Sequence, residues 1–218
     1  MKRMLIPEAL VGLLMIIAGC GSDSLAPNDP IPALSEQASA TQAGLVGYAV
    51  AAVGPLAVTY SAKSEIYNFP AGGDVTGGVL LDFRTGGAGG TASTPGNADY
   101  VEITTMGDDG LTITAPLGGQ LFVTADIMAS ITRGTPDSAT VLTGSGGTLD
   151  AGDYQTDFTI GAVAVYETGY PTGGPVVCDN GYHTVEIMFD GTALADLSLD
   201  GLVRWRFNLD TLEMAEVD

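Results

Sequence analysis

The stretch LADLSLDGLVRWRFNL, residues 194–209, contains the clearest structural pattern in the chain. In its second half, apolar side chains alternate with polar ones, with Val203, Trp205, Phe207 and Leu209 on one face and Arg204, Arg206 and Asn208 on the other. The first half alternates in the same way. An alternation with period two is typical of a β-strand with one buried face. The two halves, separated by Asp200-Gly201, therefore predict an antiparallel hairpin.

The register of this hairpin depends on the length of its loop. A two-residue loop at Asp200-Gly201 would place Asp196 opposite Trp205, which mixes the apolar and polar faces. A three-residue loop, with Gly201 in the left-handed conformation, keeps the faces together and places Ala195 or Leu197 opposite Trp205. We therefore predict the three-residue loop.

The same register gives Arg204 and Arg206 two possible roles. They lie on one face of one strand, so together they could hold an anionic ligand. The three-residue loop also places Asp196 opposite Arg204 or Arg206, as a cross-strand ion-pair partner. We prefer the structural role, in which Asp196, Arg204, Arg206 and Gly201 stabilise the hairpin.

Alternation of this kind recurs along the chain from Leu56 onward, for example in residues 100–104, 111–114 and 184–189. The runs are short, rich in Thr and separated by turns that contain Gly, which predicts an all-β fold. No helical pattern lies between them, so the strands are expected to pair antiparallel. The sequence favours an antiparallel β-sandwich, with a closed or partly open barrel as the alternative.

One helix is expected before the strands, at about residues 35–53. This segment is rich in Ala, has apolar residues at helical spacing and is followed by Gly54-Pro55, which would end a helix. We expect residues 35–218 to form a single antiparallel β domain preceded by this helix.

The N-terminus has the pattern of an export signal. Lys2 and Arg3 precede a mostly aliphatic run at residues 9–18, which is too short to span a bilayer. The following Ile17-Ala18-Gly19-Cys20 resembles the lipobox of bacterial lipoproteins: an aliphatic residue, two small residues and cysteine. The resemblance covers residues 1–22.

This resemblance implies that residues 1–19 are a lipoprotein signal peptide and that Cys20 receives a diacylglycerol and becomes the new N-terminus. Residues 20–34 would then be a lipidated tether. Gly21 and Ser22 follow the cysteine. In a host with two membranes, that sequence favours the outer membrane. The expected location is therefore outside the cytoplasm, anchored to a membrane.

The charge of the mature chain limits its partners. Removing residues 1–19 takes away Lys2, Arg3 and Glu8, which leaves five basic and 25 acidic side chains in 199 residues, a net charge of −20. Nucleic acid and anionic lipid would repel such a chain. An envelope protein or a glycan is a possible partner. Cys178 is the second cysteine, so no disulfide is expected within the mature chain. We interpret Cys178 as a small buried residue, with an intermolecular bridge or a reactive thiol as the alternatives.

Few residues suggest catalysis. His183 is the only histidine, and no Gly-x-Ser-x-Gly motif is present. Asp150, Asp153 and Asp157 are possible Ca²⁺ ligands in a glycine-flanked loop, with Asp108-Asp109-Gly110 as a second such loop. Neither loop matches an EF-hand, and we expect both to be solvated acidic loops. The Gly-rich segments 85–98 and 144–152 are expected to be long loops.

The sequence therefore favours a lipid-anchored cell-envelope protein that acts as a non-catalytic structural or binding module, with no cofactor. One alternative is a carrier or binding protein for an apolar or carbohydrate ligand, with an open pocket lined by Trp205 and other aromatic residues. Another is a hydrolase that uses two carboxylates, which would have to be buried together in a cleft.

Overall fold

The computed structural model describes residues 32–62, 64–108, 110–114, 119–134, 136–141 and 143–217. The predicted signal peptide, the lipidation site Cys20 and residues 21–31 of the predicted tether lie outside the described residues, as does Asp109.

Helix α2 (Glu36–Val53) confirms the helix predicted from the sequence. Ser35 caps its N-terminus, because the Ser35 hydroxyl accepts a hydrogen bond from Ala38 N at 3.2 Å. Glu36 in the first turn favours the positive end of the helix dipole. After Gly54 the chain forms the short helix α3 (Leu56–Thr59).

The stretch Glu36–Thr59 is long and apolar enough to cross a membrane by length and composition, and its most apolar 18-residue window has a mean hydropathy of 1.4. However, 67% of its most apolar window is buried inside the protein. The buried positions of α2 surround most of the helix axis and are mainly Ala, Gly, Val and Leu. In this structure it is the core helix.

Among the residues that the structure describes, fourteen strands and one 3-10 helix make up most of the chain after α3. In order they are β1 (Ile66–Phe69), β2 (Val75–Thr85), β3 (Thr91–Ala92), η1 (Pro95–Asn97), β4 (Tyr100–Thr105), β5 (Leu111–Thr114), β6 (Gln120–Thr132), β7 (Ser138–Val141), β8 (Ser145–Asp150), β9 (Gln155–Tyr166), β10 (Thr172–Asp179), β11 (Thr184–Asp190), β12 (Leu194–Leu199), β13 (Leu202–Asn208) and β14 (Glu213–Glu216).

The strands form one antiparallel sheet in the order β1-β2-β4-β6-β7-β9-β10-β11-β12-β13-β14, so the sheet follows the chain from one edge to the other. Two positions are each filled by a pair of short strands: β4 and β5 both lie between β2 and β6, and β7 and β8 both lie between β6 and β9. The small strand β3 adds to β2. The predicted all-β antiparallel fold with an N-terminal helix is confirmed.

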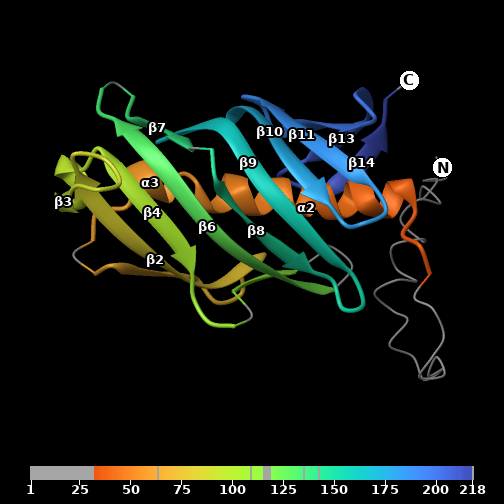
Figure 1. Cartoon of the computed structure of the whole chain (residues 1–218), viewed down its shortest axis with the longest axis horizontal. Helices are drawn as coiled ribbons and strands as arrows, with labels where there is room; N and C mark the ends of the chain where they lie inside the picture. The colour runs from red at the N-terminus through yellow and green to blue at the C-terminus, as the bar shows by residue number, and fades with distance from the viewer. Residues whose placement is uncertain are drawn as a thin grey trace, which may run out of the picture.

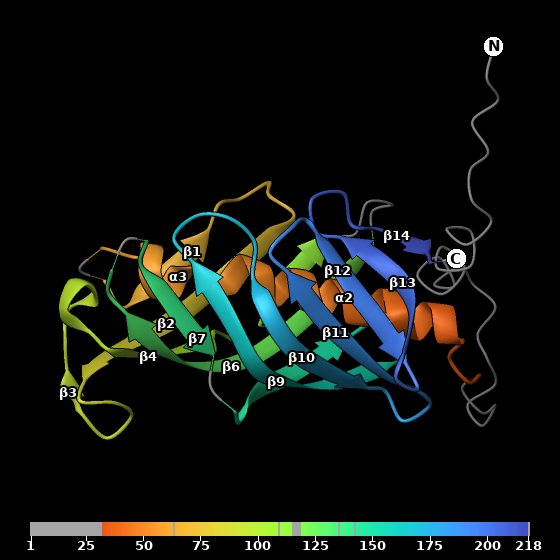
Figure 2. The ribbon, with the colours of Figure 1, turned by 90° about the horizontal axis from the view of Figure 1, so that it is seen from above.

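One face of the sheet is buried and the other is solvated, as the alternation in the sequence requires. The buried face curves around α2, which packs mainly against β9 to β13 (Figures 1 and 2). Inward-facing side chains from β2 to β13 and from α2 belong to one hydrophobic core. Within the described residues, the end strands β1 and β14 do not pair with each other. The sheet therefore does not close into a regular barrel, and its arrangement is compatible with a sandwich.

The β12–β13 hairpin corrects the predicted three-residue loop. The loop has two residues, Asp200 and Gly201, with φ of 54° and 76°. The predicted left-handed Gly201 is thus present in a shorter turn. A bulge after Val203 repairs the register, because Arg204 has no cross-strand partner in β12 and Leu197 lies opposite Trp205.

The bulge also changes which residues share a face. Before the bulge, Val203 is opposite Ser198 and is 44% exposed, whereas Trp205 after the bulge is 5% exposed. The prediction that Val203 shares the buried face of Trp205 is therefore wrong. The prediction that Leu197 lies opposite Trp205 is confirmed.

Segment 144–152, predicted to be a loop, contains strand β8. Its glycines permit close approach of neighbouring strands: a Cβ on Gly146 would lie 2.4 Å from Phe158 O, and one on Gly147 would lie 1.9 Å from Thr124 O. Segment 85–98 is mostly loop, as predicted, with only β3 and η1 inside it.

Candidate functional site

The predicted hairpin ion pair joins Asp196 and Arg206. They are direct cross-strand neighbours, and Arg206 Nε donates to Asp196 Oδ1 at 2.9 Å. Arg204 has a different partner, because the bulge directs it to the N-terminus of α2. There, Arg204 Nη1 donates to Glu36 Oε2 at 2.8 Å. Both pairs are substantially exposed, so each contributes little to stability.

All four described arginines are paired with carboxylates. Besides Arg204 and Arg206, Arg84 donates to Asp82 at 2.6 Å and Arg133 donates to Asp137 at 2.8 Å. An anionic ligand at any of these arginines would therefore have to compete with a carboxylate already bound.

The calcium candidates do not converge. Asp150 ends β8 and accepts a hydrogen bond from Gly152 N at 2.9 Å, and Asp157 accepts one from Gln155 Nε2 at 2.9 Å. Asp153 lies between them in the exposed β8–β9 turn. Across the described residues, no three His, Cys, Asp or Glu side chains gather closely enough to hold a metal ion.

Cys178 and Trp205 are core residues. Cys178 faces inward from β10, is 2% exposed and is unpaired, and its burial raises the pKa of the thiol. Trp205 and Phe207 are 5% and 0% exposed, so they do not line an open pocket of the kind a carrier would need. Trp205 Nε1 is buried without a hydrogen-bond partner among the described groups.

Acidic groups are also missing from the buried positions of the described residues. The buried polar residues there are Ser39, Gln42, Ser145, Thr156 and Ser198. Gln42 in α2 and Thr156 in β9 bond to each other at 2.8 Å, which links the helix to the sheet inside the core. A pair of buried carboxylates is not found in this part of the chain.

The start of the domain is fixed at one end of the sheet, which we call the tether end and define by Pro32, Leu34, Tyr154, Asn180 and His183. The Tyr154 hydroxyl donates to Pro32 O at 2.9 Å, and His183 Nε2 lies 3.1 Å from Leu34 O. Because a carbonyl only accepts, His183 must carry its proton on Nε2 in this contact. Asn180 Nδ2 donates to the Ser39 hydroxyl at 2.8 Å, and Leu34 is 3% exposed.

Sequence reasoning missed these contacts. Tyr154 and His183 lie in turns far from the N-terminal segment in sequence, and nothing in their spacing indicates that they bind it. The structure brings them together because the β8–β9 and β10–β11 turns reach the N-terminal end of α2.

The opposite end of the molecule, which we call the loop end, consists of residues 86–90, η1 and the turn between β6 and β7. Its loops are tightly held by hydrogen bonds. The Asp99 carboxylate accepts from Gly86 N and Gly87 N, each at 3.0 Å, and these bonds lower the pKa of that carboxyl. Arg84 Nη1 donates to Ala88 O at 2.8 Å.

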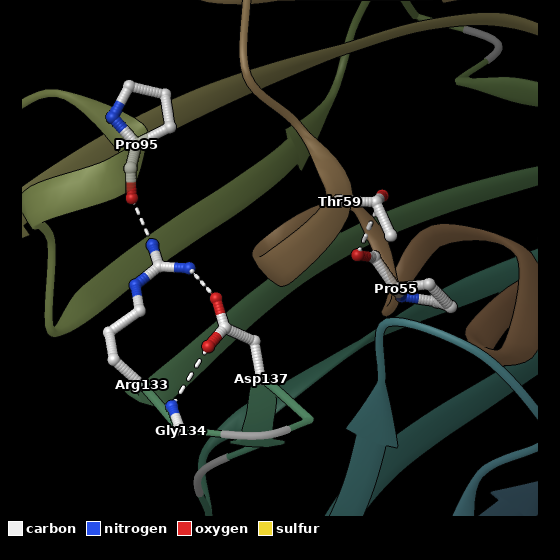
Figure 3. A network of polar contacts seen from close by, with 6 residues as sticks. All are labelled: Pro55, Thr59, Pro95, Arg133, Gly134 and Asp137. Carbon is white, nitrogen blue, oxygen red and sulfur yellow. Dashed lines mark hydrogen bonds and ion pairs between the residues drawn. The ribbon is translucent and has the colours of Figure 1, made fainter.

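Arg133 joins two parts of the loop end (Figure 3). It donates to the carbonyl of Pro95 in η1 and to the carboxylate of Asp137. Gly134 N also donates to Asp137 at 2.9 Å, and the bonds from Gly134 and Arg133 lower the pKa of the Asp137 carboxyl. The Gly-rich segment 85–98 is therefore an ordered loop that is held by hydrogen bonds.

The tether end and the loop end lie at opposite ends of the long axis, with the N-terminus of α2 at one end and α3 and β3 at the other (Figure 1). The length of the domain separates the two ends (Figure 1). The chain matches no family model, no curated protein and no solved structure.

Proposed function

We propose that this protein is a lipid-anchored, non-catalytic structural or binding module of the cell envelope. The observation that carries the proposal is the fixation of Pro32 and Leu34 by Tyr154 and His183. These contacts begin where the proposed tether from Cys20 ends, so a load on the tether would pass directly into the sheet. Residues 20–31 can reach at most about 40 Å, which keeps the tether end close to the membrane.

The paired arginines and the single continuous core also support a rigid module. The loop end is the part of such a module that a partner in the envelope can reach most easily. Loops held on a rigid scaffold commonly carry binding residues. A glycan or an envelope protein is a suitable partner, whereas the charge of −20 would repel nucleic acid.

The anchor is tested with Cys20→Ala in the host. We expect the variant to move from the membrane fraction to the soluble fraction, because each buried CH₂ of the lipid contributes about 0.8 kcal/mol to anchoring. Cys178→Ala is the matched control and should stay with the membrane. A Cys20→Ala protein that remains in the membrane pellet without aggregating would refute the proposal.

The position of the domain is tested by adding protease to intact cells and blotting for residues 35–218. Digestion would place the domain on the cell surface, where adhesion and capture of external ligands are the functions to test. Protection until the envelope is opened would place it beneath an outer layer, where assembly of envelope proteins is the function to test. In a host with two membranes, we expect the protein to co-sediment with the outer one.

A further inference from the structure

Four of the nine exposed large apolar side chains of the described residues, among them the three most exposed, lie at the tether end. Leu202 is 64% exposed, Tyr182 46%, Val203 44% and Val217 36%. We call these four the tip residues. Leu202 and Val203 follow the β12–β13 turn, Tyr182 lies in the β10–β11 turn, and Val217 follows β14. The two turns lie side by side, because Val185 at the start of β11 is opposite Leu199 at the end of β12.

Three of the four tip residues adjoin or bond to a residue that holds the start of the domain. Tyr182 precedes His183, which contacts Leu34. Val203 precedes Arg204, which binds Glu36. Val217 N donates to the carbonyl of Arg204 at 2.9 Å, which brings the end of the chain to the same place. These contacts place the tip residues at the same end of the domain as Leu34 and Glu36.

The length of chain outside the structure determines what can cover this surface. Only residues 21–31 separate Pro32 from Cys20, so the lipid on Cys20 would hold Pro32 within at most about 40 Å of the bilayer. A membrane surface is thus always present at high effective concentration. Tyrosine and aliphatic side chains are suited to the boundary between lipid headgroups and acyl chains.

Charge restricts the type of membrane. Asp179, Asp200 and Glu216 are exposed around the tip residues. These carboxylates would be repelled by anionic headgroups, and they can remain in water while the apolar side chains enter a zwitterionic surface.

We propose that the tip residues rest on the zwitterionic membrane surface that carries the lipid of Cys20, so that the domain stands with its loop end away from the bilayer. This inference rests on the proposed lipid anchor. It adds a second, reversible contact that involves side chains and that gives the domain an orientation.

The test uses full-length lipidated protein reconstituted into phosphatidylcholine vesicles. Leu202→Cys provides a thiol for an environment-sensitive fluorophore, and Ala88→Cys, exposed at the loop end, is the matched control. Labelling is selective because Cys20 carries lipid and Cys178 is buried. We expect the label at 202 to emit at shorter wavelength on vesicles and to be quenched by nitroxide-bearing lipid, while the label at 88 does not change.

The outcomes separate the two proposals. Protein that fails to float with the vesicles refutes the lipid anchor. Protein that floats but leaves the label at 202 as water-exposed as the label at 88 overturns the tip contact alone. A shift without vesicles that grows with protein concentration shows contact with a second copy, which also overturns it. Emission from the buried Trp205 checks that each variant is folded.

A final arm tests the role of charge. Vesicles that contain phosphatidylglycerol should reduce the shift of the label at 202 at low salt, and added salt should restore it, because salt screens repulsion between exposed charges. A larger shift on anionic vesicles would contradict the zwitterionic preference.

Discussion

Gly44 of α2 lies directly against the ring of Phe207 in β13, so that a Cβ on Gly44 would be 2.1 Å from Phe207 Cδ2. The ring is fully buried and cannot move away freely. Gly44→Ala should therefore lower the free energy of unfolding by about 1–3 kcal/mol, as overpacked cores do, despite the better helix propensity of Ala. Urea unfolding measures the change.

Gly47 provides the control, because a Cβ there meets its nearest neighbour, Ile187 Cγ2, at an ordinary 3.4 Å. We expect Gly47→Ala to be neutral or to stabilise by up to about 1 kcal/mol. Equal effects of the two substitutions would mean that the helix does not lie this close to β13.

Tyr60 covers part of the free edge of β1. Glu65 O accepts from Leu81 N, so the carbonyl of the next residue, Ile66, points away from β2. The Tyr60 hydroxyl lies within hydrogen-bond distance of two carbonyl oxygens, Ser64 O and Ile66 O, the latter at 3.0 Å. Tyr60→Phe should expose this edge and increase self-association with concentration, because free edges recruit other strands. Light scattering over a concentration series measures it.

Tyr67→Phe is the matched control for the edge. Tyr67 packs edge-on against Tyr60, with ring centroids 6.0 Å apart, but its hydroxyl makes no hydrogen bond to the described residues. It should leave the association state unchanged. Equal association of the two variants would contradict an edge-covering role for Tyr60.

Cys178 should be unreactive in the folded protein. Burial on the inner face of β10 blocks access and raises the pKa of its thiol, so little thiolate is present at neutral pH. A water-soluble thiol reagent should label it only after denaturant is added. Rapid labelling in native buffer would indicate that β10 opens readily.

Stability should fall in acid partly through Asp99. Its carboxyl has a lowered pKa because Gly86 N and Gly87 N donate to the ionised form. Its contribution is complete above the unfolded pKa of about 4 and disappears as the pH falls through the lower folded pKa. Between pH 7 and pH 3, the melting temperature of Asp99→Asn should therefore decrease by less than that of the parent protein.

The control for acid stability is Asp153→Asn, an exposed carboxylate that accepts no hydrogen bond from the described residues. Its melting temperature should depend on pH as the parent's does. If Asp99→Asn also follows the parent, the bonds from the 86–90 loop do not contribute to stability.

Adding Ca²⁺ should leave the melting temperature unchanged. Asp150 and Asp157 are bonded to different partners and do not converge with Asp153. Calcium needs six to eight oxygen ligands around one point. A rise in melting temperature that saturates with Ca²⁺ would show a site that this arrangement lacks.

The fold could be predicted from the sequence wherever one local pattern dominates. Ser35 and Gly54-Pro55 bracket α2, and the alternation of apolar residues identifies the strands and their buried faces. The need for an odd offset in the last hairpin was also correct. The position of the extra residue was predicted wrongly: it is Arg204, in a bulge, and not a third residue of the loop. The alternation of apolar residues could not distinguish the two, because either one restores the register.

Other features depend on contacts that no local pattern encodes. Gly146 and Gly147 suggest a loop, but they are required because neighbouring strands pass too close for a side chain. The contacts of Tyr154 and His183 with residues 32–34 join segments about 120 and 150 residues apart. Only the complete sheet brings these groups together.

The position of α2 inside the curved sheet has a consequence for biogenesis. The helix is made first, yet β9 to β13, which cover it, begin more than 100 residues later. Until those strands are made, the apolar helix lacks the strands that form its main contacts. A nascent or truncated chain that ends before β9 should therefore depend on chaperones to remain soluble.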